Sequence, residues 1–501
     1  MPEYTAAHNG SGEHRGVRSN VITRREAALG IGKGVSLLAA PYSIGCAGKD
    51  YSDPEKPNVF IAIADDWSWL HSGMEKYPAI RTPVFDRCAR EGAYFTHAFA
   101  SSPSCTPSRA ALLTGRHFWE LEQGANLWGT LPAKFRVFPD ILEREGYQIG
   151  FCEKGWGPGS VKAGGRKRNP AGPRYANFGH FLSVRPANTP FYFWFGSRDP
   201  HRYYGPRARI SRKPDFDKVD IPPFLPDVKP VRRDMGNYLF EVQRFDREIG
   251  QVLRLLERRG ELDKTIVIIT SDNGMPFPRC KANCYDWGVR VPMAVRWPGV
   301  IRAGTVVDDP VSLCDLAPSL LQKCATRSEM PLMSGDSLWP LVVPGRSSTA
   351  GRRYAFLGRE RHTLAQGDTQ EGYPVRAVRS GDYLYIRNFK PQRFPAGTPP
   401  AYLDCDSSPT KRYIIKNKDN PSVEPMFRYA FAKRAPEELY DVKNDPGQVN
   451  NVAGDEKYAG IKNELWTVLK DELVRTGDPR IRGDGDVFEE YAFHTLKRIH
   501  Q

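Results

Sequence analysis

The sequence predicts an α/β fold with a large, mixed but mostly parallel sheet flanked by helices, followed by a smaller C-terminal α+β subdomain with an antiparallel sheet. Two continuous apolar runs, 58–64 and 265–270, are typical of central strands buried on both faces. Strand candidates alternate with helical patterns between them, which indicates a mainly parallel sheet. Residues 373–389 instead alternate as an antiparallel hairpin does, with Ser380-Gly381-Asp382 as its turn.

The other elements follow from local patterns along the chain. Helices are expected at 83–91, directly after position 105 and at 138–145, and strands at 147–152 and 191–195. Residues 235–259 carry apolar side chains along one helical face and predict a long amphipathic helix. A final helix near 458–473 is expected to pack the C-terminal subdomain against the larger domain.

The first 47 residues are typical of an export signal. Four arginines between positions 15 and 25 precede a small, mostly apolar run, 27–47, that is too short and interrupted to span a bilayer. Thr23-Arg24-Arg25 resembles a twin-arginine start, and Ile44-Gly45-Cys46 resembles a lipoprotein cleavage site. We therefore expect a periplasmic, secreted or lipid-anchored protein, with Cys46 as the candidate anchor and no transmembrane span.

The predicted organisation has four parts. They are a signal peptide (1–47), a linker (48–56), a large N-terminal domain with the candidate site (57–350) and a C-terminal subdomain (351–501).

The composition narrows the class of protein without naming a partner. A hydrophobic content of 40% and a charged content of 26% are ordinary for a soluble globular protein and exclude a disordered or fibrous one. The formal net charge of +14 attracts anions, but it fits nucleic acid, anionic lipid and sulfated glycan equally well. The nine cysteines are spread out, so the chain is not a small disulfide-stapled scaffold; Cys280 and Cys284 are packing residues or one local disulfide.

Oxygen-bearing side chains follow both central strands where each strand ends. Asp65 and Asp66 follow the first strand, and Asp272 and Asn273 follow the second. Ligands of open α/β sheets bind at the carboxyl ends of the strands, and carboxylates with an amide suit calcium or magnesium rather than zinc. A single Asp in such a place more often caps a turn, but two motifs on two buried strands favour a metal site.

The segment 105–116, Cys-Thr-Pro-Ser-Arg-Ala-Ala-Leu-Leu-Thr-Gly-Arg, carries the strongest signal in the chain. Pro107 suits the first turn of a helix, so Cys105 is expected just ahead of a helix N-terminus, where an anion is favoured. Arg109 adds a guanidinium group nearby. A packing cysteine and an unmodified thiolate nucleophile are the alternatives for Cys105.

This segment resembles the signature of the formylglycine-dependent sulfatases, C-x-P-S-R followed by L-T-G-R, and the resemblance extends from about Asn58 to the last predicted helix. It implies an alkaline-phosphatase-like fold, one calcium ion and a maturation enzyme that oxidises Cys105 to formylglycine. In that family the hydrated aldehyde offers two hydroxyls on one carbon. One attacks sulfur, and loss of the proton from the other expels sulfate and restores the aldehyde.

The resemblance also implies roles for single residues. The calcium ligands would be Asp65, Asp66, Asp272, Asn273 and the modified Cys105. Arg109 matches the residue that steadies the formylglycine and the metal-bound anion.

Further catalytic roles follow from three more motifs. Lys154 and Lys281 match the two cations that bind sulfate, and His201, in Asp-Pro-His-Arg, matches the histidine that protonates the leaving group. Trp156 stands where many sulfatases carry another histidine, so no help from a histidine is expected there.

Two further segments narrow the subfamily. Residues 271–278 and 199–202 resemble the sulfamidase (heparan N-sulfatase) branch more than the aryl- or N-acetylgalactosamine-sulfatase branches. Residues 358–362 and 373–376 resemble segments that line the sugar pocket there, which predicts Glu360, His362 and Arg376 as substrate contacts. The expected partner is a sulfated glycan, carrying an O-sulfate or an N-sulfate, in polysaccharide degradation; no nucleic acid is expected.

Two other functions remain open from the sequence. A phosphatase or phosphodiesterase of the same superfamily would use Ser or Thr and two zinc-type ions with several histidines, whereas the motifs here are built from Asp and Asn. A non-catalytic polyanion-binding protein would use the basic surface and would not need Cys105.

Overall fold

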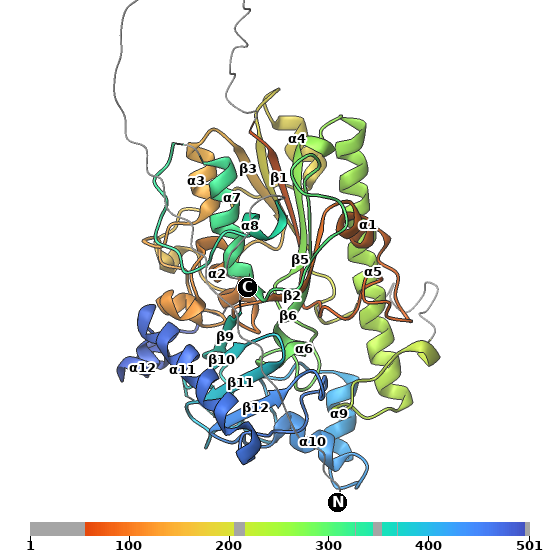
Figure 1. The fold of residues 1–501 in the computed structure, drawn as a ribbon, viewed down its shortest axis with the longest axis vertical. Helices are drawn as coiled ribbons and strands as arrows, with labels where there is room; N and C mark the ends of the chain where they lie inside the picture. Colours follow the sequence, from red (N-terminus) through yellow and green to blue (C-terminus); the bar gives the residue numbers. More distant parts are fainter. Residues whose placement is uncertain (1–55, 205–215, 326, 344–352, 368, 496–501) are drawn as a thin grey trace, which may run out of the picture. The chain divides into compact units, whose positions relative to one another are not determined.

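Four neighbouring parallel strands form one half of the central sheet (Figure 1). In spatial order they are β3 (Gln148–Glu153), β4 (Phe191–Gly196), β1 (Asn58–Ala64) and β5 (Thr265–Ser271). In the other half, β6 (Arg290–Arg296) pairs antiparallel with β5, and β2 (Ala93–Phe99) pairs antiparallel with β6. Two short strands, β7 (Thr305–Val307) and β8 (Val311–Ser312), both pair in parallel with β2. The predicted large, mixed and mostly parallel sheet is confirmed.

Helices cover both faces of this sheet because both faces of β1 are apolar. Phe60, Ala62 and Ala64 pack into one core with side chains of the helices on one face, whereas Val59, Ile61 and Ile63 pack into a second core on the other. The first face carries α1 (Pro83–Glu91), α4 (Phe178–Val184) and α5 (Lys229–Arg258). The second carries α2 (Cys105–Thr114), α3 (Phe138–Arg144) and α7 (Leu316–Cys324), and Figure 1 shows these two layers on either side of the strands.

The helix α2 differs slightly from the prediction. It begins at Cys105 itself, with Ser104 as the N-cap residue, so Cys105 is the first helical residue rather than the one before it. Gly115 ends the helix in the left-handed conformation, with φ +69°, and its N–H donates to the carbonyl of Ala111. All ten side chains of α2 are buried, so the helix is fixed along its whole length.

Some boundaries and elements were not predicted correctly. The helix α5 begins six residues before the expected Met235, because Pro230 lies in its first turn and extends the helix to Lys229. The strand β2 was missed because polar Thr96 and His97 interrupt its apolar pattern, at the point where its pairing with β6 shifts register.

The second sheet has four antiparallel strands in the order β12-β11-β10-β9. They are β9 (Ala355–Arg359), β10 (Val375–Arg379), β11 (Tyr383–Asn388) and β12 (Glu437–Asp441). The predicted hairpin is the pair β10–β11. Phe99 and Val289 from the central-sheet side share a core with Leu357 and Ala377 of this sheet, which joins the two sheets.

The C-terminal helix α11 (Ala459–Arg475) packs as expected. Its buried residues Leu465, Leu469 and Leu473 contact Tyr385 of the second sheet and Trp119 of the larger domain in one core. The remaining helices are short: α6 (Asp286–Val289), α8 (Trp339–Val342), α9 (Pro409–Lys416), α10 (Glu424–Phe431), α12 (Pro479–Arg482) and α13 (Val487–Glu490).

The computed structural model describes residues 56–204, 216–325, 327–343, 353–367 and 369–495. Glu55–Gln501 form one compact unit that contains both sheets. The predicted signal peptide, nearly all of the linker, Cys46 and the predicted boundary near residue 350 lie outside the described residues.

Two findings concern membrane spans and disulfides. Within the described ranges no helix is long and apolar enough to cross a membrane. The eight cysteines in these ranges are all unpaired, so the alternative of a Cys280–Cys284 disulfide is wrong and both residues are packing residues.

Candidate active site

The predicted catalytic and metal-binding residues converge at the carboxyl edge of the four parallel strands. Lys154 follows β3, Asp65 and Asp66 follow β1, and Asp272 and Asn273 follow β5. Cys105 reaches the same place from the N-terminus of α2. One side-chain atom from each of Asp65, Asp66, Cys105 and Asp272 lies within 4.8 Å of those of the other three, and all four residues are buried.

The backbone after β1 is held in an unusual conformation. Asp66 has φ +81°, in the left-handed region that residues other than glycine seldom adopt. The N–H of Asp66 donates to Asp272 Oδ1 at 3.2 Å, and the N–H of Asp65 donates to the carbonyl of Asp199 at 2.8 Å. Strained backbone of this kind is concentrated at functional sites, and here it turns two consecutive carboxylates into one cluster.

The carboxylates of the cluster are only partly neutralised by their neighbours. Burial alone would raise the pKa of Asp65, but Lys154, His201 and Arg109 outweigh it and hold the pKa well below its usual value. Burial also raises the pKa of Asp66, and the positive charges of Lys281 and His201 oppose this effect. Because the negative charges of Asp65 and Asp272 add to the effect of burial, the pKa of Asp66 stays above its usual value. At Asp66 the stabilisation of the carboxylate by Lys281 and His201 is therefore smaller than the combined cost of burial and of the neighbouring carboxylates.

The side chain of Asn273 offers an oxygen to this cluster. Its Nδ2 donates to Asp66 Oδ1 at 2.7 Å and to the carbonyl of Gly274 at 2.9 Å. Its Oδ1 is buried and has no hydrogen-bond partner in the described part of the chain. Three carboxylates and an unpaired amide oxygen are the donor set of a hard cation such as calcium, so the residues present fit that ion.

Cys105 is enclosed in this cluster. Its side chain is buried, and Sγ lies 3.4 Å from Asp65 Oδ1. Burial raises the pKa of the Cys105 thiol well above its usual value, and the negative charge of Asp272 adds to this effect. The helix N-terminus and the surrounding cations nonetheless make this a place where an anion is favoured.

Arg109 is a fixed cation behind the cluster. Its side chain is completely buried, with Nε donating to Asp272 Oδ2 at 2.7 Å and Nη1 donating to the carbonyl of Gly155 at 3.0 Å. Its Nη2 has no hydrogen-bond partner among the described residues and lies 3.8 Å from Asp65 Oδ1. Nε and Nη1 therefore fix the guanidinium group, and the NH2 group of Nη2 remains available at the site.

Two lysines flank the carboxylates, one on each aspartate of the Asp65–Asp66 pair. Lys154 Nζ donates to Asp65 Oδ1 at 2.5 Å, and Lys281 Nζ donates to Asp66 Oδ2 at 2.8 Å. Burial alone would lower the pKa of each lysine, but the neighbouring carboxylates outweigh burial and raise it, so both lysines are charged.

Gly196 allows Lys154 to take its place. A Cβ on Gly196 would lie 1.7 Å from the carbonyl oxygen of Lys154, so no other residue fits at the end of β4 without moving the backbone. The same two residues are joined by a hydrogen bond from the Lys154 N–H to the Gly196 carbonyl at 2.8 Å.

His201 lies at the open side of the cluster. Its side chain is 36% exposed, and Nε2 lies 3.9 Å from Asp66 Oδ2. Its Nδ1 forms a hydrogen bond with the carbonyl of Arg202, and since a carbonyl only accepts, this Nδ1 carries the proton. Nε2 is therefore the ring nitrogen that can exchange a proton with a molecule bound at the cluster.

Two arginines that the sequence did not single out hold the segment around His201. Arg202 Nη1 donates to Asp234 Oδ1 of α5 at 2.8 Å, and Arg244 of α5 binds both carboxylate oxygens of Asp199. Sequence reasoning missed Arg244 because it resembles any solvent-facing charge on an amphipathic helix.

The three predicted substrate contacts separate into two groups. His362 is close to the cluster, since its Nδ1 forms a 2.8 Å hydrogen bond with Oγ of Ser104, the residue before Cys105. Burial lowers the pKa of His362 to about 4, so its ring is neutral at pH 7.

Glu360 and Arg376 lie instead in a buried ion-pair network. Arg376 Nη2 lies 2.7 Å from Glu360 Oε1, and its Nε donates to Asp478 Oδ2 at 2.5 Å. Glu360 also accepts from Arg480 Nη2 at 2.8 Å. These enclosed pairs join β9 and β10 with α12, and they would have to open before either residue could contact a substrate.

Trp156 and Asp406 complete the surroundings of the cluster. Trp156 is buried, and its backbone N–H and carbonyl both form 2.9 Å hydrogen bonds with the Asn169 side chain. Asp406 reaches Lys281 from the segment before α9, with Oδ2 at 3.6 Å from Nζ. No motif marks Asp406, which is about 300 residues from Cys105 in a stretch without periodic pattern.

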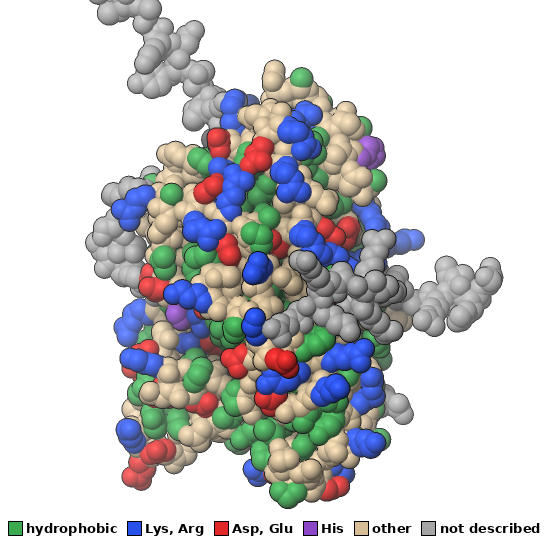
Figure 2. Space-filling model, turned by 90° about the vertical axis from the view of Figure 1, so that its right-hand side faces the viewer, with side chains coloured by type: hydrophobic (Ala, Val, Ile, Leu, Met, Phe, Trp, Pro, Cys, Tyr) green, Lys and Arg blue, Asp and Glu red, His purple; other side chains and the backbone are tan. Residues whose placement is uncertain are grey.

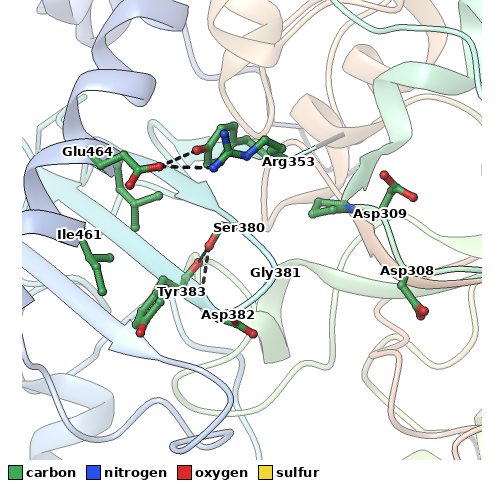
Figure 3. A pocket seen from close by; sticks show the side chains of 12 residues that line it. Asp308, Asp309, Arg353, Ser380, Gly381, Asp382, Tyr383, Ile461 and Glu464 are labelled. Carbon is green, nitrogen blue, oxygen red and sulfur yellow. Dashed lines mark hydrogen bonds and ion pairs between the residues drawn. The ribbon is translucent and has the colours of Figure 1, made fainter. Parts of the chain in front are cut away.

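The pocket beside the β10–β11 turn differs from the cluster in its charge. A pocket of about 510 Å³ beside the β10–β11 turn is lined by four carboxylates, those of Asp308, Asp309, Asp382 and Glu464, and Figure 3 shows Arg353 paired with Glu464 at its edge. On the face in Figure 2, basic side chains are spread among acidic and neutral ones rather than gathered in one patch. An acidic lining disfavours sulfate, in contrast to the cations around the buried cluster.

Comparison with known proteins identifies the family. A family model described as Sulfatase matches residues 57–165 and 174–324, together more than half of the chain. The chain belongs to the sulfatase family. It is therefore a sulfuric ester hydrolase, and the matched residues include all the candidate metal ligands as well as Cys105, Lys154, His201 and Lys281.

Curated sulfatases match over most of the chain. The human N-sulphoglucosamine sulphohydrolase is 28% identical over 510 residues, covering 88% of this chain and 95% of that protein. An ulvan-active sulfatase of Formosa agariphila is 26% identical over 471 residues, covering 85% and 76%.

Solved structures show the same fold. A protein solved in complex with its substrate D-glucosamine-2-N,6-O-disulfate has a TM-score of 0.59 at 20% identity, with 84% of this chain and 98% of that chain covered. A phosphonate monoester hydrolase from Silicibacter pomeroyi has a TM-score of 0.62 at 17% identity, covering 85% and 97%. The fold is thus shared by enzymes that act on sulfur and on phosphorus.

The ion-pair network around Arg376 predicts a large stability effect. Arg376→Met keeps the side-chain volume but leaves Asp478 buried without its main partner, which should lower the free energy of unfolding by about 3–5 kcal/mol. Denaturant titration followed by circular dichroism measures this. Arg428→Met removes an exposed helical pair with Glu424 and should cost about 0–1 kcal/mol. If the two substitutions lowered the free energy of unfolding equally, the structural role inferred for Arg376 would be wrong.

The carboxylate cluster predicts stabilisation by calcium. After chelation and dialysis, calcium at 100 times its Kd should stabilise the protein by about 2.7 kcal/mol, because the ion binds the folded cluster and not the unfolded chain. Thermal denaturation measures the effect as a rise in Tm. Asp66→Asn should abolish the rise, whereas Asp382→Asn, an exposed carboxylate in the pocket of Figure 3, should keep it. A larger rise with zinc than with calcium would contradict the assignment.

Proposed function

We propose that this sulfatase hydrolyses sulfate from a sulfated carbohydrate, with formylglycine made from Cys105 as the nucleophile and one calcium ion beside it. The observation that carries the proposal is the buried cluster in which Cys105 meets three carboxylates, Arg109 and two lysines. A bound sulfate needs cations around its oxygens, and this cluster is where the described cations converge with the modifiable residue.

The metal would be held by Asp65, Asp66, Asp272 and the unpaired Oδ1 of Asn273. Calcium supplies positive charge that draws the sulfate oxygens toward the nucleophile and compensates charge in the transition state. The donor set of carboxylate and amide oxygens supports a hard divalent ion over the zinc pair of a phosphatase.

Formylglycine supplies a hydrated aldehyde whose two hydroxyls on one carbon provide both the attacking oxygen and the means of releasing sulfate afterwards. The position of Cys105 supports this use, because it is the first residue of α2 and lies against the proposed metal ligands. Arg109, immobilised by Asp272 and by the carbonyl of Gly155, keeps one unpaired N–H group to orient the modified side chain.

Lys154 and Lys281 would bind the sulfate oxygens. Each nitrogen is anchored by one member of the Asp65–Asp66 pair, so each ammonium group is already oriented before a substrate arrives. Groups that need no reorganisation during the reaction contribute most to lowering its barrier.

His201 would donate a proton to the leaving sugar oxygen or nitrogen. The carbonyl of Arg202 fixes the proton on Nδ1, so Nε2 of the imidazolium is the donor and its loss of a proton leaves a neutral ring. The position of Nε2 on the open side of Asp66 supports this role, since the leaving group must point toward solvent.

The carbohydrate substrate is supported by the relatives. Their names specify N-sulphoglucosamine, ulvan and N-acetylgalactosamine-6-sulfate, and a similar structure contains D-glucosamine-2-N,6-O-disulfate. We further propose that the protein is exported through residues 1–47, with Cys46 as a lipid-anchor site, and that a maturation enzyme converts Cys105.

A substrate panel tests the proposed function. It contains D-glucosamine 2-N-sulfate, its 6-O-sulfate and 2-N,6-O-disulfate, N-acetylgalactosamine 6-sulfate, ulvan oligosaccharides, p-nitrophenyl sulfate and a phosphonate monoester. We expect sulfate release from at least one saccharide, a peptide mass that shows formylglycine at position 105, and no turnover by Cys105→Ala. Faster cleavage of the phosphonate than of every sulfate would overturn the proposal.

The roles of Lys281 and His201 predict different responses to the leaving group. Lys281→Ala should slow every substrate about a hundredfold to a thousandfold, or about 3–4 kcal/mol, because it removes a positive charge from beside the sulfate. His201→Ala should slow saccharides far more than p-nitrophenyl sulfate, whose leaving group needs no proton. The measurement is kcat/KM on the saccharide and on p-nitrophenyl sulfate. If His201→Ala lowered kcat/KM equally on both substrates, the assignment of His201 as the proton donor would be wrong.

A further inference from the structure

The carboxylate of Asp406 faces the candidate site and has an unused acceptor. Its Oδ2 is buried and accepts no hydrogen bond from any described residue. The nearest cation on that oxygen is Lys281 Nζ at 3.6 Å, an ion pair that is too long for a hydrogen bond. Because Oδ2 itself is enclosed, the exposed 28% of the side chain belongs to its other atoms, so an incoming molecule would reach the carboxylate on the side of Oδ1.

The segment that carries Asp406 is held firmly in place. Two residues earlier, Asp404 binds Arg359 Nη2 at 2.5 Å and accepts from both the N–H and the hydroxyl of Thr363 at 2.8 and 2.7 Å. Lys411 Nζ donates to three backbone carbonyls of the same segment, including that of Cys405 at 2.8 Å. The direction of Asp406 is therefore set by the fold and is not that of a freely rotating surface side chain.

Asp406 belongs to the wall of the cluster that contains Cys105. A single nitrogen, Lys281 Nζ, lies 2.8 Å from Asp66 Oδ2 and 3.6 Å from Asp406 Oδ2. Burial alone would raise the pKa of Asp406, but Lys281, His201 and His362 outweigh it and hold the pKa below its usual value. The group facing the site is thus a carboxylate, which can accept hydrogen bonds but cannot donate one.

A carboxylate in this place cannot serve to bind sulfate. It repels an anion, so its presence beside Lys281 opposes the capture of the sulfate group. A carboxylate that cannot help to bind the anion can still accept a hydrogen bond from a neutral donor. The chemistry that would satisfy Asp406 is an O–H or N–H donor attached to the same molecule as the sulfate.

We propose that Asp406 is a specificity-determining residue that accepts a hydrogen bond from a hydroxyl or amino group of the saccharide, close to the sulfated position. This inference rests on the proposed function, because it assigns Asp406 to the sugar that carries the sulfate. Asp406 thereby selects sulfated saccharides over anions that lack such a donor, including inorganic sulfate. A site built around a hydrogen bond discriminates strongly against molecules that leave it unmade.

The test compares two probes on a background that binds but does not turn over substrate. The full chain with Cys105→Ala is titrated by calorimetry with inorganic sulfate and with the saccharide of the panel that wild type cleaves with the highest kcat/KM. The same titrations are made after adding Asp406→Ala. Adding Asp382→Ala instead is the matched control, since it removes one exposed carboxylate at the β10–β11 turn, away from Lys281.

We expect Asp406→Ala to weaken saccharide binding about tenfold or more, and to leave the affinity for inorganic sulfate unchanged or to raise it. Asp382→Ala should change neither affinity. If Asp406 only positions Lys281, both probes will weaken together, and that result overturns the inference, as does an unchanged affinity for the saccharide. If wild type releases sulfate from no member of the panel, the proposed function itself fails, which is a different outcome from either of these.

Discussion

The burial of three carboxylates in one small cluster is the constraint on which the rest of the site depends. Charges of the same sign cannot be enclosed together unless cations lie beside them, because removal from water is costly and mutual repulsion adds to that cost. Asp272 is paired with Arg109, Asp65 with Lys154 and Asp66 with Lys281, so each acid has its own base from a different element. The unpaired Oδ1 of Asn273 beside these acids adds an oxygen that suits a further, hard cation.

The fold satisfies this constraint through the alignment of strand ends. Parallel strands finish at the same edge, so residues far apart in sequence arrive within a few ångströms of one another. Close packing then fixes them, as at the end of β4, where only glycine leaves room for the backbone of Lys154. The same edge is held to the long helix α5 by two ion pairs, Asp199 with Arg244 and Arg202 with Asp234. These pairs fix the position of the segment that carries His201 relative to the cluster.

The sequence predicted those parts of the site that have a local pattern. Asp65, Asp66, Asp272 and Asn273 each follow an apolar strand, and Cys105 lies in a continuous motif, so their meeting could be foreseen from strand topology. Glu360 and Arg376 were assigned to the substrate from a resemblance between segments, which cannot reveal that Asp478 and Arg480 enclose them. Asp406 was missed for the opposite reason, since its position depends on tertiary contacts of a segment that has no periodicity.

The burial of Cys105 has a consequence for the time at which the residue can be modified. Only 2% of its surface is accessible in the folded chain, so a maturation enzyme could not reach the thiol once the domain has closed. The core that holds α2 also includes leucines of α11, and the partners of Arg376 include Asp478, both near the end of the chain. Folding around the cysteine is therefore completed only after most of the polypeptide has been synthesised, and the oxidation proposed for Cys105 would have to precede that step.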